Sequence, residues 1–390
     1  MPPPLGSRGA ILEAKSLVLM QKSPKLRQAR FDDYPQIAAL AAKFELTVEN
    51  YSAWTHLWTN NPAYREIKGE FPMGWILESD SDGIVGYLGN IPMAYELRGQ
   101  RLMAATTRAW VVDKPYRAYS PMLLATYFQQ KNVDLFLSTT VNSQSEAAYS
   151  SFQSSRVPVG AWDRALFWIT NYPGFVASYL RRKRGELAEV ASYPLAAGLF
   201  ALDRIRGARL PRPSTSVPVV PSSGFDERFQ PFWDSLRKVK TNTLIADRSP
   251  EVLDWHFKFA LQTQSAWIYV AEKGPGLMAY SIFLRYDYPQ AGLTRVRLVD
   301  FQCLEPNKAS DVLINMLRAA IQRCCKESIH MCELVGVAPE LKTALQHTSA
   351  RERTLGSWLY FYKTNITSLA RELNDPTAWE PSLFDGDSSL

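Results

Sequence analysis

Hydrophobic and polar residues alternate along the chain with two periods, one typical of helices and one typical of strands. After a short strand that begins at Lys25, a helix is predicted because Ile37, Leu40 and Phe44 recur at helical spacing. Aspartate and proline precede them, and both residue types favour the start of a helix. A second helix is predicted in residues 47–64, where tyrosine, tryptophan and leucine share one face.

Strand patterns dominate the next part of the chain. Apolar runs predict strands, with two helices between the later ones: strands at 73–79, 84–99, 100–113, 133–141 and 157–170, and helices at 120–131 and 143–155. The order is strand, two helices, several antiparallel strands, helix, strand, helix, strand. This order indicates a mixed α+β layer with one crossover helix.

The second half of the chain repeats this order of elements. The repeat is predicted from helices at 225–238 and 249–261, strands at 265–273, 277–287 and 294–304, a helix at 309–327, a strand at 330–337, a helix at 339–347 and a closing strand at 357–364. We therefore predict a flexible leader at 1–24, one domain at 25–170, a helical and Pro/Ser-rich interdomain segment at 171–222, a second domain at 223–366 and a C-terminal tail at 367–390.

Composition agrees with two globular domains. The chain has 390 residues, of which 46% are hydrophobic, and a domain usually holds about 100–200 residues. The net charge of +6 is moderate and does not form a basic stripe with interleaved aromatics, so no nucleic-acid partner is expected. The four cysteines lack metal-binding spacing, so we expect buried, reduced thiols and no metal. No signal peptide or transmembrane segment is recognised, and a cytoplasmic location is expected.

One loop has the layout of an anion-binding site. In "VVDKPYRAYSPMLLATYFQQ" (residues 111–130) a strand ends in a basic loop, and a helix begins at Ser120-Pro121. Backbone N–H groups at such a strand-to-helix turn can bind phosphate, although this loop contains no glycine. Ser120 is expected to cap the helix and Pro121 to be its first residue.

This loop resembles the motif of the Gcn5-related N-acetyltransferase (GNAT) superfamily. That motif reads Arg/Gln-x-x-Gly-x-Gly/Ala after the fourth strand, and here Arg117 matches its first position while Ser120 and Met122 stand at the glycine positions. The preceding "WVVDKPYR" is similar to the family's strand-to-loop sequence. The resemblance implies an α+β (mixed α/β) fold of two tandem acyl-CoA N-acyltransferase domains, each a mixed, mostly antiparallel twisted sheet flanked by helices.

The resemblance also implies where acyl-CoA binds. Its pantetheine would pair with the backbone of Trp110, Val111 and Val112, and its pyrophosphate would lie at the loop and the following helix. The residues implied for cofactor binding are Trp110, Val111, Val112, Arg117, Ala118, Tyr119, Ser120, Met122 and Asn142. Tyr149, on the next helix, is implied as the acid that protonates the leaving thiolate, with packing inside a helix as its alternative role.

A base for the attacking amine is less clearly indicated. Asp113, Glu96 and Glu78 each lie at or near a predicted strand end, and deprotonation through water is an alternative. His56 lies among aromatic residues, a position more typical of a hydrogen-bonded core histidine. The second copy lacks the Arg-x-x-Gly-x-Gly pattern and carries Glu305 in its loop, so we expect that it does not bind acyl-CoA.

The function implied is an N-acyltransferase, an enzyme that transfers acetyl or another acyl group, other than aminoacyl groups, from acetyl-CoA or another acyl-CoA to a primary amine of a small molecule. Two alternatives remain: a non-catalytic GNAT-like scaffold or binding protein, and an aminoacyl-tRNA-dependent (Fem-like) transferase, which would bind charged tRNA with steep salt dependence.

Residues 179–209 admit a second kind of partner. A cluster of basic residues lies beside apolar ones, as in segments that contact a membrane surface. The alternative is an interdomain helical pair whose apolar face packs on the domains, which base rates for soluble chains favour.

Overall fold

The computed structural model describes residues 23–46, 49–67, 71–160, 162–184, 188–205, 217–336, 339–345, 348, 350–355 and 358–390. The leader predicted at 1–24 therefore lies outside the described residues except for its last two. The chain divides into two compact units, Met1–Pro92 with Ala105–Val133, and Met93–Ala104 with Asp134–Leu390. The domain boundaries predicted from the sequence stay a prediction.

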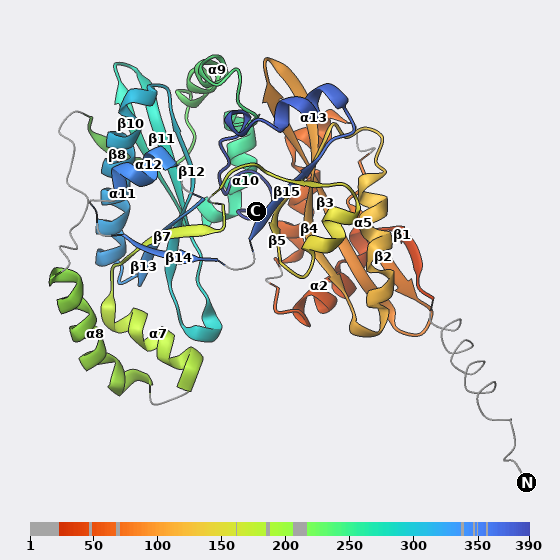
Figure 1. The fold of residues 1–390 in the computed structure, drawn as a ribbon, viewed down its shortest axis with the longest axis horizontal. Helices are drawn as coiled ribbons and strands as arrows, with labels where there is room; N and C mark the ends of the chain where they lie inside the picture. Colours follow the sequence, from red (N-terminus) through yellow and green to blue (C-terminus); the bar gives the residue numbers. More distant parts are fainter. Residues whose placement is uncertain are drawn as a thin grey trace, which may run out of the picture. The chain divides into compact units, whose positions relative to one another are not determined.

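Unit 1 holds the first strands and helices (Figure 1). Its strands pair in the order β1 (Lys25–Gln28), β2 (Gly74–Ser79), β3 (Gly83–Leu97), β4 (Gln100–Val112), with the far ends of β3 and β4 counted in unit 2. Its helices are α2 (Tyr34–Ala42), α3 (Tyr51–Thr59), α4 (Pro62–Glu66) and α5 (Ser120–Phe128), with 3-10 turns η1 (Phe31–Asp33) and η2 (Lys114–Tyr119).

Local chemistry explains where these helices start. The Asn50 side chain accepts a hydrogen bond from the Ala53 N–H (2.9 Å), which caps α3. Asn61 caps α4 in the same way, with Pro62 as its first residue. Helix α3 is fixed by Trp58, whose indole N–H donates to the Asn90 carbonyl (2.8 Å).

Unit 2 contains a small group of strands and a larger sheet. In the small group, β15 (Leu359–Lys363) lies between β5 (Leu135–Val141) and β6 (Ser155–Arg156). The seven-stranded sheet has the order β14 (Arg351–Thr354), β7 (Arg164–Ile169), β13 (Met331–Val335), β12 (Arg295–Cys303), β11 (Gly276–Arg285), β10 (Ala266–Lys273), β8 (Val219–Ser222). Only β12 and β13 are parallel in it, so the sheet is mixed and mostly antiparallel.

The remaining elements of unit 2 surround these strands. They are α6 (Glu146–Ser151), α7 (Tyr172–Arg184), α8 (Ala188–Ile205), α9 (Phe229–Val239), α10 (Pro250–Gln262), α11 (Ala309–Lys326), α12 (Pro339–Leu345), α13 (Thr367–Leu373), the short strand β9 (Ile245–Ala246), and the turns η4 (Pro289–Ala291), η5 (Pro306–Lys308) and η7 (Pro376–Ala378). Strand β9 pairs with the far end of β3.

Two strands of unit 2 pair with distant partners. Strand β7 precedes the interdomain segment in the sequence, yet it pairs with β13 and β14 of the seven-stranded sheet. Strand β15 closes the second half of the sequence, yet it pairs with β5 and β6. Each half of the chain therefore supplies one strand to the strand group of the other half.

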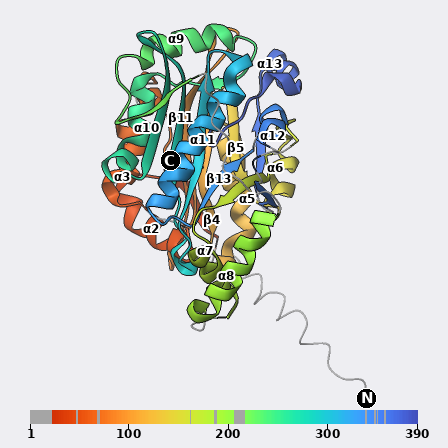
Figure 2. The same ribbon diagram turned by 90° about the vertical axis from the view of Figure 1, so that its left-hand side faces the viewer.

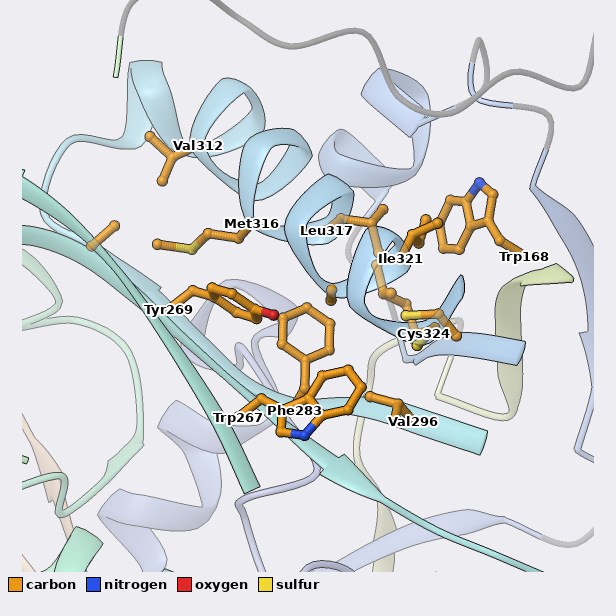
Figure 3. Packing of buried hydrophobic residues seen from close by; sticks show 14 of the residues in the cluster. Trp168, Trp267, Tyr269, Phe283, Val296, Val312, Met316, Leu317, Ile321 and Cys324 are labelled. Atoms are coloured by element: carbon orange, nitrogen blue, oxygen red, sulfur yellow. The ribbon is translucent and has the colours of Figure 1, made fainter. Parts of the chain in front are cut away.

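The core of unit 2 forms where α11 covers the seven-stranded sheet. Figures 1 and 2 show α11 along one face of this sheet, and Figure 3 shows Val312, Met316, Leu317 and Ile321 of α11 packed over the strand residues Trp267, Tyr269, Phe283 and Val296. Because neighbouring side chains of a strand point to opposite faces, Tyr280 points away from α11 and contacts Phe229 and Phe232 of α9. Helices thus flank both faces.

Three of the four cysteines are buried free thiols, as expected: Cys303, Cys324 and Cys332. Cys325 is exposed, contrary to the expectation, because it lies on the outer side of α11. Within the described residues no helix is long and apolar enough to cross a membrane. The same residues contain no group of three or more His, Cys, Asp or Glu side chains that could hold a metal ion.

Candidate functional site

Strand β4 is kinked just before its last residues. Ala109 has a φ of +52°, a left-handed conformation that non-glycine residues rarely adopt. The strand continues through Trp110, Val111 and Val112, and the side chains of both valines are buried. A residue in this conformation interrupts the regular geometry of a strand, as a β-bulge does. The end of β4 is therefore the place at which we consider an extended ligand.

The basic loop after β4 is a compact 3-10 helix. The Tyr116 N–H donates to the Asp113 carbonyl (2.8 Å), and the Ser120 N–H donates to the Arg117 carbonyl. The loop is fixed by the buried Tyr116, whose hydroxyl donates to Asp82 Oδ2 (2.6 Å). Two backbone N–H groups of the loop thus have partners inside the loop, and they are not free for a phosphate.

The prediction that Ser120 caps helix α5 is wrong. Tyr119, with φ −91° and ψ −7°, is the N-cap of α5, and it makes no side-chain cap bond. Ser120 is already helical, with φ −52° and ψ −39°, because the 3-10 turn runs directly into α5. Arg117 and Met122 are exposed, and Met122 keeps 41% of its surface accessible. The groups that this loop presents to an anion are therefore chiefly side chains.

The end of β5 and the following helix belong to unit 2. Asn142 Oδ1 accepts a hydrogen bond from the Ser145 N–H (2.9 Å), so its side chain closes the turn into α6. Tyr149 of α6 is buried, with its ring centroid 5.5 Å from that of Phe361 on β15. Tyr149 therefore packs inside unit 2, whether or not it also acts as an acid.

The acidic residues considered as bases all pair with cations. Asp113 accepts a hydrogen bond from Lys43 Nζ (2.8 Å), and Glu96 accepts one from Arg237 Nη1 (3.2 Å).

Glu78 is held more firmly than the other two. It accepts two hydrogen bonds from Arg27 (2.8 and 2.9 Å), and this pairing lowers the pKa of Glu78. The remaining candidate, His56, is buried, and its Nδ1 lies 3.0 Å from Asn60 Oδ1, in keeping with a core histidine. Neither residue has the surroundings of a base.

The site residues predicted from the sequence divide between the two units. Unit 1 carries Asp113 and the contiguous residues Trp110–Val112 and Arg117–Met122. Unit 2 carries Glu96, Asn142 and Tyr149. Within unit 2, Asn142 lies at the start of the turn into α6 and Tyr149 lies inside α6, whereas Glu96 lies on β3 opposite Ile245 of β9.

One polar contact beside these residues was not predicted. Asp387 accepts hydrogen bonds from the hydroxyl groups of Thr139 (3.1 Å) and Thr140 (3.3 Å) near the end of β5. The segment 380–390 that carries Asp387 is packed and not loose, since Leu383 and Phe384 are buried. Its polar sequence, "DGDSS", is typical of a solvated tail and gives no signal of this contact.

A buried ion cluster fixes this segment to unit 2. Arg248, whose side chain is 2% exposed, donates to both oxygens of the fully buried Asp300 (2.9 and 3.0 Å). It also donates to Asp385 Oδ1 (3.3 Å), and burial raises the pKa of Asp385 to about 6. The Phe384 N–H donates to the Val299 carbonyl of β12 (3.2 Å). Segment 380–390 thus joins β12 through charges and backbone.

The corresponding place in the second sheet is small and acidic. Beyond Leu298 and Leu334, where the pairing of β12 with β13 ends, lies a cavity of about 70 Å³ that is also lined by Glu380–Leu383. In the loop after β12, Lys273 and Lys308 both bond to Glu305 and lower the pKa of Glu305 to about 2. That this half does not bind acyl-CoA stays a prediction.

Element order, the parallel pair within a mostly antiparallel sheet, and the repeat together define a class of fold: two mixed α/β sheets flanked by helices, in a tandem GNAT-like arrangement.

Three solved structures are similar to this chain over most of its length. A GCN5-related N-acetyltransferase from Anabaena variabilis has 13% identity and a TM-score of 0.53, over 88% of this chain and 73% of that chain. N-myristoyltransferase from Saccharomyces cerevisiae, solved with bound myristoyl-CoA, has 12% identity and a TM-score of 0.56, over 93% and 80%. A GCN5-related N-acetyltransferase from Kribbella flavida has 10% identity and a TM-score of 0.51, over 89% and 72%. No family model and no curated protein matches the chain. At sequence identities of 10% to 13%, this structural similarity shows the fold alone.

Proposed function

We propose that the chain is an acyltransferase that moves acetyl or another acyl group from acyl-CoA to a primary amine of a small-molecule acceptor. The observation that carries this proposal is the kinked end of β4, where Ala109 adopts a positive φ immediately before Trp110–Val112 and the Arg117 loop. A strand end whose regular geometry is interrupted suits pantetheine, and exposed cations suit its phosphates. We place this activity in the cytoplasm as part of the proposal.

The binding roles follow from these surroundings. Backbone groups of Trp110, Val111 and Val112 pair with pantetheine, and a backbone N–H there polarises the acyl carbonyl. Because the Ser120 N–H already donates to Arg117, phosphate binding rests mainly on the Arg117 side chain. Ala118, Tyr119, Ser120 and Met122 form the surface on which the diphosphate lies. The role of Asn142 in cofactor binding rests on the family resemblance alone.

The chemical roles are a proton donor and a proton acceptor. The amine attacks the thioester carbonyl, the bond from carbon to sulfur breaks, and Tyr149 gives its hydroxyl proton to the departing thiolate. Asp113 accepts the proton from the amine, directly or through water, once its contact with the exposed Lys43 opens. Glu96, which pairs with Arg237, is the second candidate for this role.

A non-catalytic scaffold is the second candidate function. It is favoured by the loop itself, in which the 3-10 turn uses the Ser120 N–H and the Met122 side chain stands where the family has a small residue. The tRNA-dependent alternative has less support, because residues 179–212 hold eight basic and three acidic residues, which leaves a net charge of only +1 for the rest of the chain.

A ligand-dependent thermal shift tests the proposal. At about 100 times its Kd, acetyl-CoA adds about 2.7 kcal/mol to stability, which raises Tm by several degrees. Arg117→Glu should weaken binding about ten- to hundredfold, because a charge-assisted phosphate contact becomes repulsive. Arg371→Glu, a charge reversal on the exposed face of α13, is the matched control and should bind like the unaltered chain.

Turnover separates the two candidates. Release of free CoA thiol in the presence of primary amines supports the transferase. A thermal shift without thiol release from any acyl-CoA and amine pair supports a binding protein. No shift with any acyl-CoA at millimolar concentration contradicts both the acyl-CoA site and the transferase.

A further inference from the structure

Helices α7 and α8 form a hairpin within unit 2. Figures 1 and 2 both show them side by side, and the ring centroids of Tyr172 and Phe200 lie 5.3 Å apart. The hairpin is anchored by Asp203 of α8, which accepts hydrogen bonds from the Tyr172 hydroxyl (2.9 Å) and from Arg351 of β14. The expected pairing of two helices is therefore present.

Helix α8 differs from an ordinary surface helix in which side chains it buries and which it exposes. Its buried positions include Ser192, Ala196 and Asp203, which are small or polar. Its exposed positions include five large apolar side chains: Tyr193 is 67% exposed, Leu195 54%, Phe200 45%, Leu202 41% and Ile205 83%. A helix that packs on a protein core places such residues inward. The expectation that the apolar face packs on the domains is thus wrong for α8, whereas Val176 and Ala177 of α7 are buried as expected.

This apolar surface is concentrated in one place. Among the described residues twelve large apolar side chains are exposed, and six of them lie on the hairpin, including Tyr179 of α7. Single exposed apolar residues are ordinary on protein surfaces, whereas a contiguous group marks an interaction site.

Positive charge accompanies the apolar residues. Residues 179–212 carry a net charge of +5, nearly all of the +6 of the whole chain. Arg181 and Arg182 are exposed near the end of α7. Arg204 is exposed on α8, and its guanidinium lies over the Phe200 ring, 5.3 Å from the centroid. An arginine that covers an aromatic ring keeps its charge at the boundary between apolar and aqueous surroundings.

We propose that the α7–α8 hairpin docks on an anionic lipid surface. The large apolar side chains of α8 enter the boundary between headgroups and acyl chains, and Arg181, Arg182 and Arg204 contact lipid phosphates. With 18 residues, α8 is about 27 Å long, a length that can lie in the plane of the surface. The charge identifies the occupant, because exposed arginines beside apolar residues match anionic lipid.

Vesicle co-sedimentation of the full chain tests this surface. Binding is expected to vesicles in which about one third of the lipid is anionic, and not to vesicles of zwitterionic lipid alone. Leu195→Gln/Ile205→Gln removes two exposed apolar groups and leaves the Asp203 anchor in place, and should weaken binding at least about tenfold. Val239→Gln/Tyr288→Gln, at two exposed apolar positions elsewhere in unit 2, is the control and should bind unchanged.

A charge variant and an assembly measurement complete the test. Arg182→Glu/Arg204→Glu should weaken binding to anionic vesicles by about tenfold or more and reduce its salt dependence. Circular dichroism should show that every variant keeps the helix content of the unaltered chain. The proposal is overturned if the unaltered chain ignores anionic vesicles, or if the Leu195/Ile205 variant binds them equally well. It is also overturned if light scattering shows a dimer that this variant abolishes, since the face is then a protein interface.

Discussion

Removing the charge of Arg248 should destabilise unit 2 far more than removing an exposed arginine. Arg248→Met deletes the two hydrogen bonds to Asp300, the one to Asp385 and one to the Ala246 carbonyl (2.9 Å). Asp300 is completely buried and keeps only the Tyr280 hydroxyl (2.7 Å) and the Gln302 amide (3.1 Å) as donors. Burial favours a raised pKa for Asp300, but the Arg248 charge and the hydrogen bonds from Arg248, Tyr280 and Gln302 together lower the pKa.

The size of the loss follows from this geometry. Breaking a buried ion pair by removing one partner costs about 3–5 kcal/mol, because a desolvated charge is left uncompensated. For a unit of more than about 200 residues each kcal/mol corresponds to about 2–4 °C, so Tm should fall by about 10 °C. The double variant Arg248→Met/Asp300→Asn removes the unpaired buried charge of residue 300 and keeps an oxygen that accepts the hydrogen bond from the Tyr280 hydroxyl. This double variant should recover at least about 1 kcal/mol.

Urea unfolding followed by circular dichroism measures these differences. Arg285→Met is the matched control, since Arg285 makes the same kind of contact with Asp287 (2.9 Å), but with side chains that are 41% and 36% exposed. The exposed Arg285–Asp287 pair should contribute less than about 1 kcal/mol to the free energy of unfolding. Equal losses for Arg248→Met and Arg285→Met would refute the view that a buried cluster holds segment 380–390 in place.

Three further predictions concern the same segment, the β4 kink and the proposed acid. Because the folded pKa of Asp385 is raised to about 6, the free energy of unfolding of unit 2, measured with urea, should fall by about 1 kcal/mol as the pH rises from 5 to 7. Asp385→Asn should remove this fall. If the variant shows the same pH dependence as the unaltered chain, the assigned pKa is contradicted. At Ala109, with its φ of +52°, Ala109→Val should cost at least about 1–2 kcal/mol and Ala109→Gly less than about 1, and equal effects in thermal unfolding would argue against the kink. Tyr149→Phe keeps the ring packing on Phe361, so it should lower kcat about ten- to hundredfold with unchanged acyl-CoA affinity, and full activity excludes Tyr149 as the acid.

The sequence pattern predicts the kind of each element because the pattern is local. The apolar spacing of Ile37 and Leu40 predicts α2, the long period of residues 309–327 predicts α11, and the apolar run at 133–141 predicts β5, all of which the structure contains. The fold class is confirmed in the same way, since the order of elements follows from these local patterns.

Strand partners and side-chain partners could not be predicted in this way. Strands β7 and β15 are both apolar, so their patterns fit either strand group, and pairing depends on contacts formed across much of the chain. Asp387 meets Thr139 across 248 residues of sequence, and no local signal marks that contact. The prediction that Ser120 caps α5 was wrong because a 3-10 turn that begins at Lys114 runs to Tyr119 and leaves no extended cap residue before the helix.

Isothermal titration of the full chain with acetyl-CoA tests the central claim most directly. The kinked β4 end with Arg117 predicts one binding site per chain, because the cavity at the corresponding place of the second sheet is only about 70 Å³ and the loop after β12 lacks the Arg-x-x-Gly-x-Gly pattern. One site that Arg117→Glu weakens at least about tenfold is the predicted result. No binding at millimolar acetyl-CoA, or a single site that Arg117→Glu leaves unchanged, would contradict the account.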